Sequence, residues 1–198
     1  ALELVTATAG VYIGLIVACA VVYALFGMTA FDAICHAMAT LATGGFSTHD
    51  LSFKFFQSPA IEWAGTVFML LGALPFVVMI QAVRGSPYAL WRDEQVRGFL
   101  SFICIVVLVL GTWMAITRGV DIMTGLRLAA FNVTSIVTTT GFASDDYTAW
   151  GTFAIGVFFL LTFVGGCSGS TSGAIKIYRL QVAGMLTRRH FTHLISPH

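Results

Sequence analysis

The chain has 198 residues, of which 58% are hydrophobic and 10% are charged, and its formal net charge is +1. A soluble domain carries roughly 25% charged residues, so this chain has too few charges to cover a water-facing surface. The mean hydropathy of +0.89 points the same way. The composition therefore excludes an ordinary soluble domain and predicts an integral membrane protein.

Four uncharged stretches are long enough to cross a bilayer, which takes about 20 helical residues. Charged residues bound them at Glu3 and Asp32, Glu62 and Arg84, Arg97 and Arg118, and Asp146 and Lys176. We therefore predict membrane-spanning helices near residues 7–29, 61–82, 98–117 and 150–175. The first is not predicted to be a signal peptide, because it lacks a basic flank and a small-residue cleavage site.

Two further apolar stretches, 31–42 and 126–138, are too short to span. A dozen helical residues cover under about 20 Å, whereas the hydrocarbon core is about 30 Å thick. Each stretch would enter the membrane and stop near its middle, and the polar segments 47–58 and 143–148 would return the chain to the same side. Each half of the chain is thus predicted to be a helix, a re-entrant half-helix, a hairpin and a second helix.

A Thr/Gly segment ends each half-helix. Residues 42–47 (ATGGFS) recur as residues 138–143 (TTTGFA), at an offset of 96 positions. The offset aligns Thr43 with Thr139, Gly45 with Gly141, Phe46 with Phe142 and Asp50 with Asp146. A duplication at matched spacing indicates a structural repeat, which ordinary loops between shorter helices would not explain. Because non-helical backbone at membrane depth must be covered by protein or line a cavity, we expect both segments to line a cavity.

The chemistry of the two segments suits a dehydrated cation, which needs a ring of oxygens in place of its water shell. Backbone carbonyls provide this ring when successive residues point the same way into a pore, in dihedrals that glycine accepts. The candidates are the glycines Gly44, Gly45 and Gly141, the threonines Thr43, Thr139 and Thr140, which offer both a carbonyl and a hydroxyl, and, for an inner layer, Ala42 and Thr138.

The half-helices would direct their partially negative C-terminal ends at the same point. Asp32 is placed to cap the first half-helix, and Asp121 or Thr124 the second. We expect Phe46 and Phe142 to pack behind the cation-binding segments rather than to touch the ion.

His36 and Asn132 occupy equivalent half-helix positions, and we expect both to pack or to form hydrogen bonds; a proton-sensing role for His36 is the alternative. No residue of the Thr/Gly segments is charged, which argues against a proton relay, because a relay needs ionisable groups within the membrane. The cysteines lack a C-x-x-C spacing and are predicted to be small buried hydrophobic residues: Cys19, Cys35, Cys104 and Cys167.

A Gly/Ser segment at residues 165–174 (GGCSGSTSGA) interrupts the last apolar stretch. It is not a phosphate-binding loop, which follows a strand and places Lys directly after its last glycine, whereas Ala174 follows Gly173 here. Its glycines and hydroxyl residues do not favour a regular helix. It is either a plain linker or a flexible loop that obstructs the ion path, and its membrane depth favours the loop. The loop residues are Gly165, Gly166, Ser168, Gly169, Ser170, Thr171, Ser172 and Gly173.

The basic residues predict the orientation. Seven would share one side, namely Arg84, Arg92, Arg97, Lys176, Arg179, Arg188 and Arg189, against Lys54, Arg118 and Arg127 on the other. This excess places the 83–97 linker and the C-terminal tail in the cytoplasm. Most acidic residues then lie outside, where they raise the local cation concentration; the pair Asp145 and Asp146 is expected to form a solvated mouth rather than an acid/base dyad.

Three segments of the chain resemble the Trk/Ktr/HKT superfamily of potassium transporters, most closely its bacterial TrkH type. They are FDAICHAMATLATGGFSTHD from Phe31, FNVTSIVTTTGFAS from Phe131 and GGCSGSTSGAIK from Gly165. The resemblance covers essentially the whole chain. It implies an all-α integral membrane fold of tandem helix–re-entrant pore loop–helix repeats, like those of potassium channels. This chain would hold the second and third of four repeats, as a fragment of a longer subunit, divided into 1–82, a linker 83–97, 98–180 and a tail 181–198.

The resemblance implies potassium uptake across the bacterial inner membrane. Thr43, Gly44, Thr139 and Thr140 would coordinate K+, Gly45 and Gly141 would be the filter glycines, and residues 165–173 would form an intramembrane gating loop. It also implies a homodimer of the full-length subunit and a cytoplasmic nucleotide-binding regulatory subunit such as TrkA. No cofactor is implied besides the transported K+.

Two other classes of function are weighed against potassium uptake. A secondary transporter of a small solute, with a midplane site at broken helices, is the alternative that the Gly/Ser segment allows. An enzyme is not expected, because the apolar segments contain neither a nucleophile–base pair nor a metal-ligand cluster. A nucleic-acid partner is not expected either.

Overall fold

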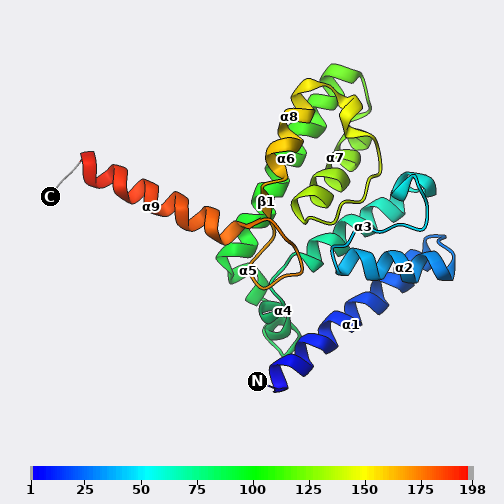
Figure 1. Cartoon of the computed structure of the whole chain (residues 1–198), viewed down its shortest axis with the longest axis horizontal. Helices are drawn as coiled ribbons and strands as arrows, with labels where there is room; N and C mark the ends of the chain where they lie inside the picture. Colours follow the sequence, from blue (N-terminus) through cyan, green and yellow to red (C-terminus); the bar gives the residue numbers. More distant parts are fainter. Residues whose placement is uncertain (1, 196–198) are drawn as a thin grey trace.

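The computed structural model describes residues 2–195, with side chains through Phe191. Figure 1 shows two groups of helices joined in the middle of the chain, with the last helix extending away from both. The elements are α1 (Leu2–Leu25), α2 (Ala30–Leu41), η1 (Ser52–Phe56), α3 (Pro59–Gly72), α4 (Phe76–Val83), α5 (Ala89–Arg92), α6 (Glu94–Arg118), α7 (Ile122–Val137), η2 (Tyr147–Trp150), α8 (Thr152–Leu161), β1 (Val164–Gly165), β2 (Ile175–Lys176) and α9 (Ile177–Ile195).

The same order of elements occurs twice, as the duplicated motif predicts. A long helix packs against a shorter one, α1 against α2 and α6 against α7. A short 3-10 turn and a further helix follow in each half, η1 and α3 in the first and η2 and α8 in the second. The halves meet where α3 packs against α7.

The long helices bear out only part of the predicted spans. Within the described residues, α1 and α6 are long and apolar enough to cross a membrane, and α3 with α4 adds a third span if the bent pair is counted as one. The predicted span 61–82 is not continuous, because α3 and α4 meet at an angle of 101°. Pro75 stands at the break, where it removes a backbone donor and its ring clashes with the preceding turn.

The predicted span 150–175 is interrupted by the Gly/Ser segment, as expected, but its helix is shorter than a span. α8 ends at Leu161, and a loop runs from there to α9. β1 and β2 pair in parallel, with Val164 opposite Ile175 and Gly165 opposite Lys176. This short ladder brings the two ends of the loop together.

The caps of the half-helices differ from the prediction in one case. Asp121 caps α7 as expected, because its carboxylate accepts from Met123 N and Thr124 N at 3.1 and 3.3 Å. The cap of α2 is Thr29 rather than Asp32. Thr29 Oγ1 accepts from Asp32 N at 3.1 Å and donates to the Asp32 carboxylate at 2.8 Å. Asp32 therefore does not cap α2 itself but accepts a hydrogen bond from the hydroxyl of the capping threonine.

Two hydrophobic clusters form the core. One lies among α6, α7 and α8, and the other among α1, α2, α3 and η1. Phe131 of α7 belongs to the second cluster, where its ring centroid lies 4.9 Å from that of Phe53 in η1. The first half therefore packs around a side chain of the second. Of the cysteines, Cys19 and Cys167 are buried as predicted, whereas Cys35 is half-buried and Cys104 is exposed.

The close contact between α6 and α7 depends on glycine. A Cβ on Gly111 of α6 would lie 3.0 Å from Leu126 Cα and 2.7 Å from Leu126 Cδ2, and a Cβ on Gly125 would lie 3.0 Å from Gly111 O. By contrast, a Cβ on Gly156 of α8 would meet nothing within 4 Å.

Gly111→Ala should therefore destabilise the protein relative to Gly156→Ala. Overpacking costs about 1–3 kcal/mol, which exceeds the gain of roughly 1 kcal/mol in helix propensity that both variants share. Thermal denaturation of the full-length protein in detergent measures the difference. Equal midpoints for the two variants would contradict the packing described for α6 and α7.

Candidate ion-conduction site

The two Thr/Gly segments leave their half-helices through the same hydrogen bonds. Thr43 N donates to Thr40 O at 3.2 Å, and the equivalent Thr139 N donates to Ile136 O at 3.0 Å. One residue further on, Gly44 N donates to Ala39 O at 2.8 Å, and Thr140 N donates to Ser135 O at 2.9 Å. Each pair of bonds is related by the offset of 96 seen in the sequence. The sequence duplication is thus a duplication of backbone geometry.

The backbone of both segments alternates in handedness. Thr43 and Gly45 have φ of +50° and +68°, and the equivalent Thr139 and Gly141 have φ of +59° and +90°. The residue between each pair, Gly44 or Thr140, is not in a left-handed conformation. A chain that alternates in this way turns successive peptide planes so that their carbonyls face the same side, as an oxygen-lined filter requires. A threonine with positive φ is strained, and both segments contain one at the same position.

The segments also touch each other. A Cβ on Gly45 would lie 2.0 Å from Thr140 O and 3.3 Å from Gly141 C. Glycine is therefore required at position 45 both for its dihedral angle and for this contact. At Gly141 only the dihedral angle requires glycine, since a Cβ there would meet nothing within 4 Å.

His36 and Asn132 form hydrogen bonds that link each half-helix to the chain after its Thr/Gly segment. His36 Nδ1 lies 2.8 Å from Asp32 O and Nε2 lies 2.9 Å from Ser47 Oγ. A neutral ring satisfies both contacts, with Nδ1–H donating to the carbonyl and Nε2 accepting from the serine hydroxyl. Asn132 repeats this arrangement, because its Nδ2 donates at 2.9 Å to Leu128 O and to Ser144 Oγ. The predicted hydrogen-bonding role of both side chains is confirmed.

The two phenylalanines do not behave alike. Phe142 is buried, with its ring centroid 4.6 Å from that of Phe53, and packs behind its segment as predicted. Phe46 is 80% exposed, so the prediction that it packs behind the filter is wrong for this chain.

The two inner-layer candidates also differ from each other. Ala42 is exposed, whereas Thr138 is buried and its hydroxyl lies 2.8 Å from that of Thr140.

The Gly/Ser loop lies directly against the two segments. Thr43 Oγ1 donates to Thr171 O at 3.1 Å, and Gly173 N donates to Thr139 Oγ1 at 2.7 Å. One loop thus contacts the equivalent threonine of each segment.

The loop also completes the break between α3 and α4. Gly72 O accepts from Thr171 N at 3.3 Å and from Thr171 Oγ1 at 2.9 Å, and Ala73 O accepts from Cys167 N at 3.0 Å. Phe76 N, in the first turn of α4, donates to Gly169 O at 3.1 Å. Backbone groups that the broken helix leaves without helical partners are therefore satisfied by the loop. These contacts between the loop and the α3–α4 break cannot be found from the sequence, although Pro75 signals the break itself.

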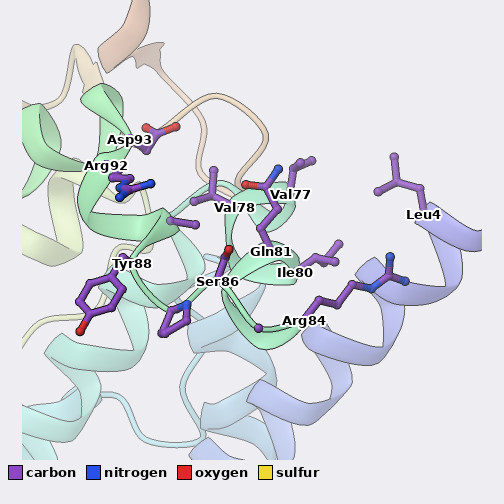
Figure 2. Close-up of a pocket in the computed structure, with 13 residues that line it drawn as sticks. Leu4, Val77, Val78, Ile80, Gln81, Arg84, Ser86, Tyr88, Arg92 and Asp93 are labelled. Atoms are coloured by element: carbon purple, nitrogen blue, oxygen red, sulfur yellow. The ribbon is translucent and has the colours of Figure 1, made fainter.

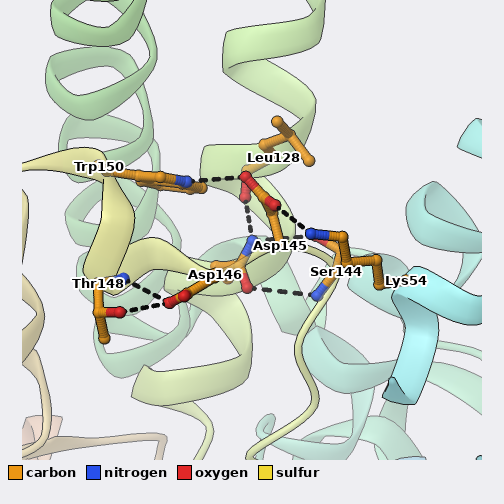
Figure 3. A network of polar contacts seen from close by, with 8 residues as sticks. Lys54, Leu128, Ser144, Asp145, Asp146, Thr148 and Trp150 are labelled. Carbon is orange, nitrogen blue, oxygen red and sulfur yellow. Dashed lines mark hydrogen bonds and ion pairs between the residues drawn. The ribbon is translucent and has the colours of Figure 1, made fainter.

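At the opposite end of α7, the acidic pair is held by separate partners (Figure 3). Asp145 accepts from Trp150 Nε1 at 2.9 Å and from Lys54 Nζ at 3.0 Å, and Asp146 accepts from Thr148 N at 3.0 Å. Burial alone would raise the pKa of Asp145, but the hydrogen bonds from Trp150 and Lys54 outweigh it and lower that pKa. Hydrogen bonds from Thr148 lower the pKa of Asp146. Both carboxyls thus favour the ionised form, and their role in a solvated acidic mouth stays a prediction.

Another cavity, of about 960 Å³, lies at the corner of α4 and α5. Figure 2 shows Arg84 near Leu4, and Arg92 beside Asp93 at the other end of this cavity. Its basic groups do not converge, and it contains none of the Thr/Gly residues. Within residues 2–195, no group of three or more His, Cys, Asp or Glu side chains is placed to hold a metal ion. The Thr/Gly segments and the loop are therefore the candidate site.

Asp145→Asn should lower the denaturation midpoint of the full-length protein at pH 7, by an amount equivalent to about 1 kcal/mol. The folded-state pKa of Asp145 is lowered, so its contribution is present above the unfolded pKa and is lost as the pH falls through the folded pKa. The difference from wild type should therefore shrink below about pH 4. The control is Asp50→Asn, at an exposed position. An equal midpoint for the two variants at pH 7 would contradict the role given to Asp145.

Comparisons with known proteins identify the family of the chain. The TrkH family model, described as a cation transport protein, matches residues 2–198. The chain is 51% identical over 190 residues to the Trk system potassium uptake protein TrkI of Halomonas elongata, covering 96% of this chain and 38% of that protein. It is 36% identical over 190 residues to the Trk system potassium uptake protein TrkH of Escherichia coli K12, covering 94% and 39%.

The fold has a solved counterpart. The crystal structure of the potassium transporter TrkH from Vibrio parahaemolyticus matches with a TM-score of 0.94 at 34% identity, over 98% of this chain and 42% of that one. The predicted all-α membrane fold is confirmed by this likeness. The chain spans about two fifths of the length of these relatives. It belongs to the TrkH family of cation transport proteins.

Proposed function

We propose that this chain supplies two of the four filter segments of a protein that takes up potassium across the bacterial inner membrane. Thr43, Gly44, Thr139 and Thr140 would present oxygens to dehydrated K+, with Ala42 and Thr138 as an inner layer. Gly45 and Gly141 would be the filter glycines. The observation that carries the proposal is the matched alternation of φ in two segments whose backbones touch. The names of the relatives, which state potassium uptake, support it.

The second part of the proposal is that the loop at residues 165–173 gates this path. Its contacts to Thr43 and Thr139 support a position across the inner end of the filter. A Cβ on Gly165 would lie 2.1 Å from Gly173 O, and one on Gly166 would lie 2.4 Å from Ser172 Oγ. The glycines thus let the loop fold tightly on itself, and its non-helical backbone provides a segment that can move separately from the helices.

The third part concerns the whole subunit. The excess of basic residues on one side supports a cytoplasmic location for the 83–97 linker and for the tail 181–198, of which residues 196–198 lie outside the described part. The full-length subunit would form a homodimer and bind a cytoplasmic nucleotide-binding subunit such as TrkA. The repeats would be residues 1–82 and 98–180.

Gly45→Ala should reduce the selectivity for K+ over Na+ about fivefold or more in the full-length protein, because a strained or displaced filter costs about 1–3 kcal/mol. Gly156→Ala in α8 is the control, because Gly156 lies outside the Thr/Gly segments. It is not in a left-handed conformation, and its Cβ would meet nothing within 4 Å. Ion flux into proteoliposomes measures the ratio. Unchanged selectivity in Gly45→Ala would contradict the assignment of the filter.

Deleting residues 169–172 should raise K+ flux through the full-length protein, since it removes the part of the loop that includes Thr171. The same proteoliposome assay measures the flux, and the denaturation midpoint reports whether the fold survives. A folded deletion variant with wild-type flux would show that the loop is a linker and not a gate.

A further inference from the structure

Lys176 carries its charge into the interior of the Gly/Ser loop. Its Nζ donates to Ser172 O and lies 3.4 Å from Ser172 Oγ and 3.5 Å from Ser170 Oγ. The side chain is half-buried. Lys176 is one of the seven basic residues that the sequence places on the cytoplasmic side, but its ammonium group points back into the loop.

The oxygens around this ammonium are fixed by the loop itself. Ser170 Oγ donates to Cys167 O at 2.6 Å and lies 2.9 Å from Ser172 Oγ, which accepts from Gly166 N at 3.1 Å. β2 holds Lys176 at the base of the loop, opposite Gly165. The lysine and the three oxygens are therefore held by one closed network.

No carboxylate among the described residues forms an ion pair with Lys176. Within the part of the chain that the structure describes, the ion pairs are His49 with Asp32, Lys54 with Asp145, and Arg127 with Glu62. None includes Lys176. Its ammonium is stabilised by one carbonyl and two hydroxyl oxygens, which are also the kinds of ligand that replace the water shell of K+.

The ammonium lies next to the contacts between the loop and the filter segments. Ser172 stands between Thr171, whose carbonyl accepts from Thr43, and Gly173, whose N–H donates to Thr139. A cation bound at Ser172 is therefore one residue away from both contacts, at the inner end of the proposed filter.

We propose that the Lys176 ammonium occupies a cation site in the loop formed by Ser170 Oγ, Ser172 O and Ser172 Oγ. As a tethered cation, it holds the loop across the ion path and excludes K+ from these oxygens. When the ammonium leaves this site, its hydrogen bonds to Ser170 and Ser172 are lost. The same oxygens then become available to a free monovalent cation. This inference rests on the proposed gating function of the loop.

The test compares variants of the full-length protein in proteoliposomes. Lys176→Met should raise K+ flux about tenfold, since the charge-assisted bonds that fasten the loop are lost. Lys176→Arg, which keeps the charge, should stay near wild type. Arg179→Met removes an exposed charge three residues after Lys176, in α9, and should leave the flux unchanged. A purely structural role for Lys176 does not explain increased flux in Lys176→Met at an unchanged denaturation midpoint. Nor does it explain near-wild-type flux in Lys176→Arg.

A soluble amine tests the cation site itself. Methylammonium should lower the flux of Lys176→Met towards wild type, because it can occupy the vacated oxygens, and should leave the variant lacking residues 169–172 unaffected. Wild-type flux in a folded Lys176→Met variant, or equal effects of methylammonium on both variants, would overturn the inference. If the deletion also leaves flux unchanged, the gating function itself fails. If the deletion raises flux and Lys176→Met does not, only the role of Lys176 fails.

Discussion

Backbone that leaves helical geometry inside a membrane must find its hydrogen-bond partners within the protein, because hydrocarbon offers none and each unsatisfied group costs several kcal/mol. Four of the breaks in helical geometry are joined by hydrogen bonds, namely those after α2, after α7, between α3 and α4, and after α8. The loop that follows α8 supplies partners to the other three. It bonds Thr43 and Thr139 through Thr171 and Gly173, and it satisfies the carbonyls that the α3–α4 break exposes.

This mutual dependence explains why the irregular segments lie together. The loop is not free to move without disturbing groups on three other elements, and a gate built in this way has defined contacts to break. If the loop gates as proposed, its opening has either to break the bonds at Gly72, Ala73 and Phe76 or to move α4 with it. The Thr/Gly segments have their own support in His36 and Asn132, which bond to a half-helix carbonyl on one side and to a serine after the segment on the other.

The sequence predicted the features that are repeated and missed those that depend on a single contact. The offset of 96 identified both Thr/Gly segments, and the structure gives them matching φ values and matching bonds. The same symmetry gives a wrong prediction for the packing of Phe46, because equivalent positions in the two copies do not have the same neighbours. Phe142 has Phe53 beside it, whereas Phe46 is exposed.

Two other features are not evident from the hydropathy of the sequence: the break between α3 and α4 and the direction of the Lys176 side chain. The span 61–82 is predicted as one helix because no charged residue lies between Glu62 and Arg84, but Pro75 stands at a break within it. Lys176 is grouped by sequence with the cytoplasmic charges, and only the fold of the loop shows that its ammonium turns inwards. Neither feature can be found from hydropathy, which reports the length of a segment but not where its backbone or side chains bond.

The central claim is that Thr43, Gly44, Thr139 and Thr140 present their oxygens to a monovalent cation. Crystals of the full-length protein grown with Tl+ in place of K+ test it most directly, through the anomalous signal of that ion. The account predicts an anomalous peak bounded by the carbonyls of these four residues. A structure at comparable resolution with bound Tl+ elsewhere and none at these carbonyls would contradict it.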